Sequence, residues 1–325
     1  MASDIYSQSA FLVRKAAYFY YVLNMSQQEI ADYLNISVTT VSRLIRRAKE
    51  EKLVKYVLDD ACISCINLAE HIRLRYGIKE VIVAPISDAD KDLTDEAKRK
   101  LVALESARYL QRMLMPDDVL GISWGRIVND MLLYLNPSRK THTRFVTLHG
   151  HLSSCVSQNL LDLVEGMKKT FSGKDSYIPS EAILQDALEA VRVMKQAEVM
   201  KVFDMFDSVN ISIAGIGTWY PEPHSLLAQG HLITQKDVDQ LIASGVVGDI
   251  GLRFFDMNAM ECKTDLPYRT IAMGLEQYKK IPYKIVVAAG DDKAVTLDRA
   301  LKGGLADMLI VDESLGRCLL EIDAI

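Results

Sequence analysis

The sequence predicts an α/β protein in two parts: an N-terminal helix-turn-helix domain over residues 1–60, and a doubly wound parallel-sheet domain over residues 61–325. Three observations lead to this prediction. Two helical patterns meet across a short turn within residues 26–51, and from residue 80 onwards short apolar runs alternate with helical patterns. The charge is also uneven: residues 1–58 hold 8 Lys and Arg against 5 Asp and Glu, whereas the whole chain of 325 residues carries a net charge of −5. A basic end on an acidic body indicates that the small domain meets a polyanion.

The composition is that of an ordinary globular protein, with 49% hydrophobic and 25% charged residues. No apolar run is long enough to span a membrane, and the first residues lack the layout of a signal peptide. Five cysteines, an odd number, fit a reducing compartment better than a disulfide framework. We therefore expect a cytoplasmic protein without membrane contact, in which Cys62 and Cys65 are buried on a helix rather than bound to a metal.

The stretch SQQEIADYLNISVTTVSRLIRRAKEE, residues 26–51, contains the signals that start and stop two helices. Ser26 and Glu29 form a capping box. Asn35 is suited to a left-handed helix end, and Ser37 can cap the next helix. Apolar residues recur at helical spacing in the second helix and predict its buried face: Val38, Val41, Leu44, Ile45 and Ala48.

The other face of the second helix is polar at its start and basic towards its end. A DNA-recognition helix has the same order, because its first residues meet base edges and its later basic residues meet phosphates. The pattern also fits an ordinary helical hairpin with a solvated charged face, but the short turn, the early hydroxyls and the local positive charge favour DNA binding. The predicted DNA-binding residues are Ser37, Thr39, Thr40, Ser42, Arg43, Arg46 and Arg47.

Segments on either side of this motif complete the small domain. An apolar helix around residues 11–23 is expected to pack as its third helix. The β-like run KLVKYVLDD, residues 52–60, is expected to act as a wing along the DNA backbone. A further helix over residues 61–76 is expected to join the two domains.

The larger domain is predicted from apolar runs separated by helical patterns. Near-continuous Val, Ile and Leu runs are typical of strands that are buried on both faces of a parallel sheet. The runs are VIVAP (81–85), VLGIS (119–123), FVTLHG (145–150), VNISIAGIG (209–217), KIVVAAG (284–290) and MLIVD (308–312). Such sheets bind ligands at the carboxyl ends of their strands, near a switch in strand order.

Four glycine-containing segments are candidate strand ends for such a ligand site. In GISWGRIVND, backbone N–H groups at a helix start and Arg126 can hold an anion. In AAGDDKAVTLDRAL, Lys293 lies in the first helical turn, where a cation is unfavourable to the helix dipole. A lysine in this position often contacts an anion, but a solvated lysine is equally common. In VVGDIGLRFFD, Asp249 and Arg253 stand in apolar surroundings, and IAGIGTW is expected to be a close-packing turn. A metal site in HGHLSSC (149–155) is not expected, because alternate side chains there point apart.

Taken together, these motifs resemble the SorC/DeoR-type sugar-responsive transcription regulators of bacteria. The matching segments are QQEIADYLNISVTTVSRLIRRA, GISWGRIV, VVGDIGLRFFD and AAGDDKAVTLDRALKGGLADMLIVDE, which follow in the family's order along most of the chain. The resemblance implies an effector domain that is similar in fold to sugar-phosphate isomerases, a tetrameric assembly, and DNA affinity that changes when a sugar phosphate binds. The family's effector loops correspond here to Gly121, Trp124, Gly125, Arg126, Gly150, Asp249, Arg253, Gly290 and Lys293.

The sequence departs from the family pattern at several of these loops. Ile127 stands where Thr is frequent, and His151 stands where Gly is frequent. Asp291 and Asp292 place two negative charges beside Lys293. These carboxylates suit sugar hydroxyls better than a phosphate, so the effector is left open between a sugar phosphate and a neutral sugar or polyol.

We therefore predict a regulator of a carbohydrate-utilisation operon, not an enzyme, which needs no cofactor and binds operator DNA as a symmetric dimer or tetramer. In its effector site, Arg126 and Lys293 are expected to attract a phosphate, and Asp249 to accept hydrogen bonds from hydroxyls. One alternative is a sugar-phosphate isomerase or deaminase with an added helical domain, which needs a general base such as Asp249 or His149. Another is a helical interaction module that is unrelated to DNA.

Overall fold

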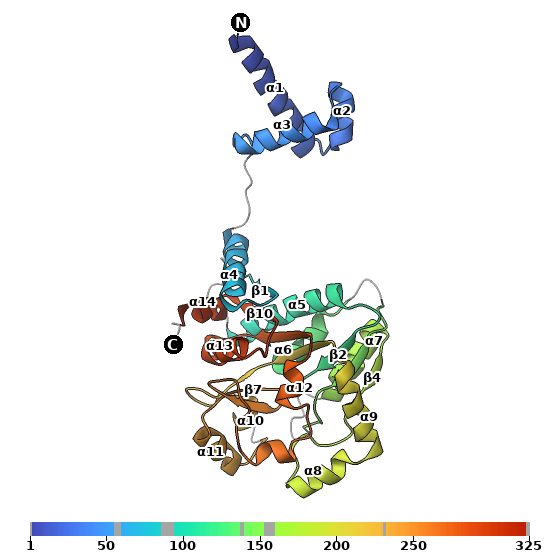
Figure 1. Ribbon diagram of the computed structural model, residues 1–325, viewed down its shortest axis with the longest axis vertical. Helices are drawn as coiled ribbons and strands as arrows, with labels where there is room; N and C mark the ends of the chain where they lie inside the picture. The colour runs from blue at the N-terminus through green and yellow to red at the C-terminus, as the bar shows by residue number, and fades with distance from the viewer. Residues whose placement is uncertain are drawn as a thin grey trace. The chain divides into compact units, whose positions relative to one another are not determined.

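The computed structural model describes residues 2–54, 60–85, 94–136, 140–152, 160–229 and 232–322. The chain divides into two compact units, Met1–Asp59 and Asp60–Ile325 (Figure 1). The β-like run expected as a wing falls mainly on residues 55–59, which lie outside the described residues. No helix in the described ranges is long and apolar enough to cross a membrane.

Helices in the small unit start and end where their capping signals stand. The Ser26 hydroxyl accepts from the backbone N–H of Glu29, whose carboxylate accepts from the Ser26 N–H at 2.7 Å, so the capping box is confirmed. Asn35 ends the second helix in the left-handed conformation, with φ 53°. Ser37 then caps the third helix by accepting from the N–H of Thr40 at 3.1 Å. The helices are α1 (Ala2–Tyr21), α2 (Gln27–Leu34) and α3 (Val38–Glu50).

A compact apolar core joins these three helices. Its fully or nearly fully buried members are Val13, Ala16, Ala17, Ile30, Ala31, Val41, Ile45 and Ala48. Small alanines on all three helices allow their backbones to approach closely. Val38, which was expected on the buried face, is instead 37% exposed, because it stands in the first turn at the edge of the apolar stripe.

The large unit is built on a parallel sheet with the strand order β1-β10-β9-β5-β2-β3-β4. The six predicted apolar runs all form strands of this sheet. The seventh strand, β4, is short and polar, so no apolar run marked it. The strands are β1 (Glu80–Ala84), β2 (Val119–Ile122), β3 (Arg144–Thr147), β4 (Lys174–Ser176), β5 (Ile211–Gly215), β9 (Tyr283–Ala288) and β10 (Met308–Asp312).

Side chains on these strands alternate between two core clusters, one on each face of the sheet. In β9, for example, Val286 enters one cluster and Ile285 the other. The first cluster includes side chains of α4 (Asp60–Tyr76), α8 (Ala187–Met194), α9 (Ala197–Met205), α12 (Leu275–Lys279), α13 (Ala294–Lys302) and α14 (Glu313–Glu321). The second includes side chains of α5 (Asp95–Met113), α6 (Arg126–Met131), α7 (Leu160–Phe171), α10 (Leu226–Gln229) and α11 (Gln235–Ala243). Helices therefore cover both faces, which confirms the doubly wound prediction.

A second sheet of three antiparallel strands, β6-β7-β8, was not predicted. Its strands are β6 (Gly217–Thr218), β7 (Val246–Ile250) and β8 (Arg253–Asp256). The segment VVGDIGLRFFD, a candidate strand end, forms the β7–β8 hairpin instead. Gly251 and Leu252 make its turn with φ of 56° and 63°, as tight hairpin turns require. The alternation that usually reveals a hairpin is missing, because β7 is buried on both sides.

Candidate functional site

A pocket opens where the strand order of the main sheet reverses. The chain runs outward from β2 to β3 and β4, returns to β5 on the other side of β2, and continues outward through β9 and β10. Loops that follow β2, β5 and β9 line the pocket, together with the start of α5 and part of β7. Its volume is ≈ 560 Å³, within the range of pockets that hold small molecules. This is the position at which open α/β sheets bind ligands.

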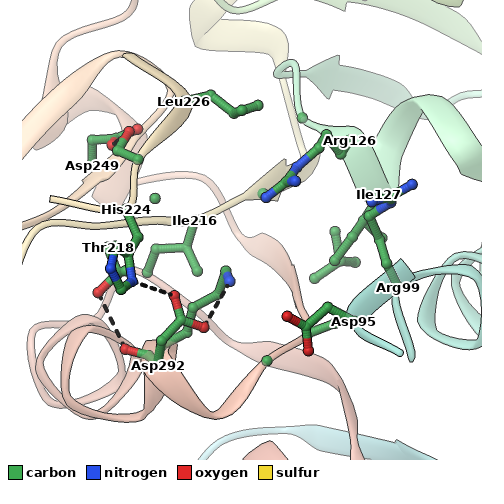
Figure 2. Close-up of a pocket in the computed structure, with 18 of the residues that line it drawn as sticks. Asp95, Arg99, Arg126, Ile127, Ile216, Thr218, His224, Leu226, Asp249 and Asp292 are labelled. Atoms are coloured by element: carbon green, nitrogen blue, oxygen red, sulfur yellow. Dashed lines mark hydrogen bonds and ion pairs between the residues drawn. The ribbon is translucent and has the colours of Figure 1, made fainter. Parts of the chain in front are cut away.

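Most of the residues predicted to bind an effector line this pocket: Trp124, Gly125, Arg126, Asp249, Gly290 and Lys293. Arg126 is exposed, and its guanidinium extends towards the pocket interior (Figure 2). No residue in the described ranges forms a hydrogen bond or ion pair with that guanidinium. Lys293 is different, because its Nζ lies 3.2 Å from Oδ1 of Asp292 and its side chain is only 17% exposed.

Two predicted glycines lie outside the pocket lining and serve close packing. A Cβ on Gly121 would come within 2.7 Å of the Leu148 side chain and 2.9 Å of the Val209 side chain. A Cβ on Gly150 would lie 2.4 Å from the carbonyl oxygen of Ser180. Both positions are therefore restricted to glycine by their neighbours, not by the approach of a ligand to the pocket.

Arg253 also lies outside the pocket lining, contrary to the expectation. It is 8% exposed and donates from Nη2 and Nε to the carbonyl oxygens of Ala272 and Met273, at 2.6 and 2.9 Å. Glu261 accepts from Nη1 at 3.4 Å. The buried guanidinium thus holds a neighbouring backbone segment against β8. In the sequence, an arginine with this structural role and an arginine that contacts a ligand both stand among apolar residues, so the two roles cannot be told apart.

Asp249 reaches the pocket from β7 and is 7% exposed. Its Oδ1 accepts from Nε1 of Trp219 at 2.7 Å and from the hydroxyl of Ser225 at 2.6 Å. Burial raises the pKa of Asp249, and these two hydrogen bonds act in the opposite direction. A Cβ on Gly217 would lie 2.2 Å from Oδ1, so β6 passes directly beside the carboxylate.

Asp292, which the sequence placed beside Lys293, forms a polar wall with Thr218 and His224, which sequence reasoning missed (Figure 2). Nδ1 of His224 lies 3.4 Å from Oδ2 of Asp292. The Thr218 hydroxyl is 2.7 Å from that of Thr296 and 3.4 Å from the Asp292 carbonyl oxygen. IAGIGTW contains Thr218, but the segment was interpreted only as a packing turn. The following loop to His224 carries no recognisable motif.

His149 lies behind the loop that follows β2 and is 1% exposed. Its Nδ1 donates to the Gly150 carbonyl at 2.7 Å, and its Nε2 accepts from the Trp124 N–H at 3.1 Å. Burial lowers the pKa of His149 to about 4, so the ring is neutral at physiological pH. Both ring nitrogens are occupied, and the ring therefore positions the Trp124 turn.

Metal binding receives no support from the residues that can be described. Within those ranges, no group of three or more His, Cys, Asp or Glu side chains is arranged to hold a metal ion. Cys155 of HGHLSSC lies outside the described residues. Cys65 is buried on α4, with its thiol 3.7 Å from Oε2 of Glu313.

In the small unit, the predicted polar face of α3 points to solvent. Arg43 and Arg46 are exposed, as are Thr39 and Thr40, whereas Ser42 is half-buried. Neither Arg43 nor Arg46 has an ion pair or hydrogen bond in the part of the chain that the structure describes.

Two other residues of this face already have partners within the helix region. Nε of Arg47 lies 2.5 Å from Oε1 of Glu51, one turn further along. The Ser37 hydroxyl caps α3 and lies 2.8 Å from the Thr40 hydroxyl. Any contact of Arg47 or Ser37 with another molecule therefore competes with these local interactions.

Comparison with known proteins gives matches along both units. Residues 60–321 match the family described as putative sugar-binding domain, and residues 13–51 match sigma-70, region 4. The deoxyribonucleoside regulator of Bacillus subtilis is 29% identical over 308 residues, which cover 94% of this chain and 96% of that protein. The sorbitol operon regulator of Klebsiella pneumoniae is 26% identical over 316 residues, which cover 95% and 98%. The crystal structure of that full-length regulator, SorC, matches with a TM-score of 0.73 and 26% identity over 96% of this chain and 98% of that one.

A helix-turn-helix unit with an outward basic face, joined to a sugar-binding unit, defines a ligand-responsive regulator of transcription. The chain belongs to the SorC/DeoR-type family of sugar-binding transcriptional regulators. The predicted combination of a DNA-binding domain and a sugar-binding domain in one regulator is thereby confirmed.

Proposed function

We propose that this regulator controls a carbohydrate-utilisation operon and that a sugar-type effector, free or phosphorylated, binds in the pocket at the strand-order reversal. The observation that carries the proposal is the convergence of Arg126, Asp249 and Lys293 on that pocket from three segments far apart in the sequence. Two relatives are named for sorbitol and for deoxyribonucleosides, which supports an effector of carbohydrate chemistry.

On DNA, the start of α3 reads base edges and its later arginines contact phosphates. Thr39, Thr40, Ser42 and Arg43 are the proposed base-reading residues, because they occupy the outward face of the first two turns. Arg46 and Arg47 follow on that face and suit phosphates. A single helix of this kind covers little DNA, so the protein binds its operator as a symmetric dimer or tetramer, in the cytoplasm.

Binding without turnover fits the pocket better than catalysis does. The enzyme alternative rests on Asp249, since burial raises its pKa as a general base requires. However, Oδ1 of this carboxylate already holds two donors, which leaves only Oδ2 for a proton transfer, and His149, the other candidate base, is enclosed with both nitrogens occupied. Turnover assays over a panel of sugar phosphates test this point directly.

The proposal is tested by coupling effector binding to DNA binding. Thermal-shift screening of the full-length protein against sugars, polyols and their phosphates identifies a ligand, because a compound that binds only the folded state raises its stability. Fluorescence anisotropy then measures operator affinity with and without that ligand. Arg126→Ala and Lys293→Ala are expected to lose the response, whereas Arg192→Ala, an exposed cation on α8, is expected to keep it. A parent-like response in both pocket variants would place the effector site elsewhere.

A further inference from the structure

The charges that line the pocket balance one another. Among the described lining residues, four side chains carry a carboxylate and four carry a permanent positive charge. The carboxylates are Asp95, Asp249, Asp291 and Asp292, and the cations are Lys98, Arg99, Arg126 and Lys293. A phosphate monoester carries a charge of about −1.5 to −2 at pH 7, and proteins that bind it through side chains use clusters of unneutralised cations. A balanced lining does not supply such a cluster.

Three of the four cations are also already engaged. Nζ of Lys98 is 2.8 Å from the Ser314 hydroxyl and 3.7 Å from Oδ1 of Asp291. The side chains of Lys98, Arg99 and Lys293 are only 17–22% exposed, whereas those of the carboxylates beside them are 22–52% exposed. The other two pairs are Arg99 with Asp130 at 2.6 Å and Lys293 with Asp292 at 3.2 Å. Only Arg126, among the cations of the described lining, is without a carboxylate partner.

Two carboxylates, those of Asp249 and Asp292, lie on the wall opposite Arg126 (Figure 2). Asp249 holds two donors on Oδ1, and no described residue donates to its Oδ2. Asp292 lies on the same side, with His224 beside it. A carboxylate accepts hydrogen bonds from sugar hydroxyls, but a phosphate dianion has no proton to donate and is repelled.

We propose that the pocket selects an uncharged polyhydroxy compound, a free sugar or polyol, over its phosphate ester. This inference rests on the proposed function and specifies the chemistry of its effector. Hydroxyls of the ligand donate to Asp249 and Asp292, and the Arg126 guanidinium donates to its hydroxyl or carbonyl oxygens. Asp292 determines the selection, because its pairing with Lys293 leaves that cation without the free charge that a phosphate requires.

The test compares each neutral compound with its own terminal phosphate on the full-length protein. The probes are ribose and ribose 5-phosphate, fructose and fructose 6-phosphate, and sorbitol and sorbitol 6-phosphate, each titrated by isothermal calorimetry. At least one neutral compound is expected to bind about tenfold or more tightly than its phosphate, since each tenfold step corresponds to about 1.4 kcal/mol. Tighter binding of the phosphates overturns the inference and leaves the proposed effector pocket standing. If no member of either series binds or changes operator affinity, the proposed function fails and the inference fails with it.

A matched pair of variants tests the electrostatic cause. Asp292→Asn keeps the size of the side chain, removes one negative charge and releases Lys293. The ratio of phosphate to neutral affinity is expected to rise by about tenfold. Asp204→Asn makes the same charge change on an exposed position of α9, outside the pocket lining, and is expected to leave the ratio unchanged. An equal ratio in the parent and in Asp292→Asn would contradict the role given to Asp292.

Discussion

On α3 of the small unit, Arg43 and Arg46 extend into solvent and have no ion pair within the described residues. In the pocket of the large unit, by contrast, Lys98, Arg99 and Lys293 are each held by a carboxylate. A surface that binds a polyanion gains affinity from free cations, because each one releases a counterion from the DNA. A pocket that binds hydroxyl groups needs donors and acceptors in balance. The two regions, the exposed face of α3 and the pocket, therefore differ in whether their cations are paired with carboxylates, more than in how many cations they contain.

In the large unit, the largest expected effect is the dependence of stability on pH that the buried ring of His149 produces. The unfolded chain takes up a proton on His149 below pH 6.5, whereas the folded protein takes it up only near pH 4. The contribution of His149 to the unfolding free energy is therefore fully present above pH 6.5 and is lost, by roughly 3 kcal/mol, as pH drops towards 4. Urea unfolding at several pH values can be followed by tryptophan fluorescence, because both tryptophans, Trp124 and Trp219, lie in the large unit.

A variant isolates the histidine from other groups that titrate in the same range. His149→Gln is expected to flatten the dependence of stability on pH, and His71→Gln, at an exposed position on α4, should keep the slope of the parent. A slope in His149→Gln as steep as in the parent would show that another group carries the effect.

On the exposed face of α3, the comparison is tested by removing one cation that has no ion pair within the described residues. Arg43→Ala is expected to weaken operator binding by about 1–3 kcal/mol and to relax specificity at one base position. Fluorescence anisotropy on the operator and on single-base variants measures both effects, with Arg192→Ala in the large unit as the control. Unchanged operator binding in a Thr40→Ala, Arg43→Ala double variant would refute the assignment of α3 as the reading helix.

A smaller effect is expected at the capping box that starts α2. Ser26→Ala removes the acceptor for the Glu29 N–H and should destabilise the small unit by about 1 kcal/mol, whereas Ser26→Gly should cost only a few tenths. Hydrogen exchange of the α2 amides measures the difference. Equal protection in the alanine variant and the parent would show that packing against α1 and α3 holds this helix without its cap.

The smallest effect is expected for Arg47, whose guanidinium resembles the paired cations of the pocket. The contact of Arg47 with Glu51 must break before the guanidinium reaches a phosphate. Arg47→Ala should therefore weaken binding to all DNA sequences alike, and by less than Arg43→Ala does. The slope of log Kd against log salt should fall by about 1. Glu51→Gln, which removes the negative charge of this partner, should strengthen binding slightly. An unchanged salt slope in Arg47→Ala would mean that the ion pair persists on DNA.

Some features of the protein could be predicted because their causes are local. Ser26, Glu29 and Asn35 mark helix ends through hydrogen bonds and dihedral angles that span only a few residues. The six apolar runs predict strands because a parallel sheet that is covered on both faces demands apolar side chains along the whole strand. The position of the pocket follows from that same sheet, since the carboxyl ends of parallel strands converge at one edge.

Other features were decided by tertiary contacts between distant parts of the chain. Arg253 was expected to meet a ligand, but carbonyl groups about twenty residues away surround it, and no local pattern reveals them. The hairpin of β7 and β8 is hidden because burial on both sides of β7 removes the alternation of polar and apolar residues. Lys98 and Asp291 are nearly two hundred residues apart in sequence, yet they meet at 3.7 Å. Sequence alone determined which charged residues the chain carries, whereas the fold determined which of them neutralise one another, because Coulomb interactions depend on distance in space.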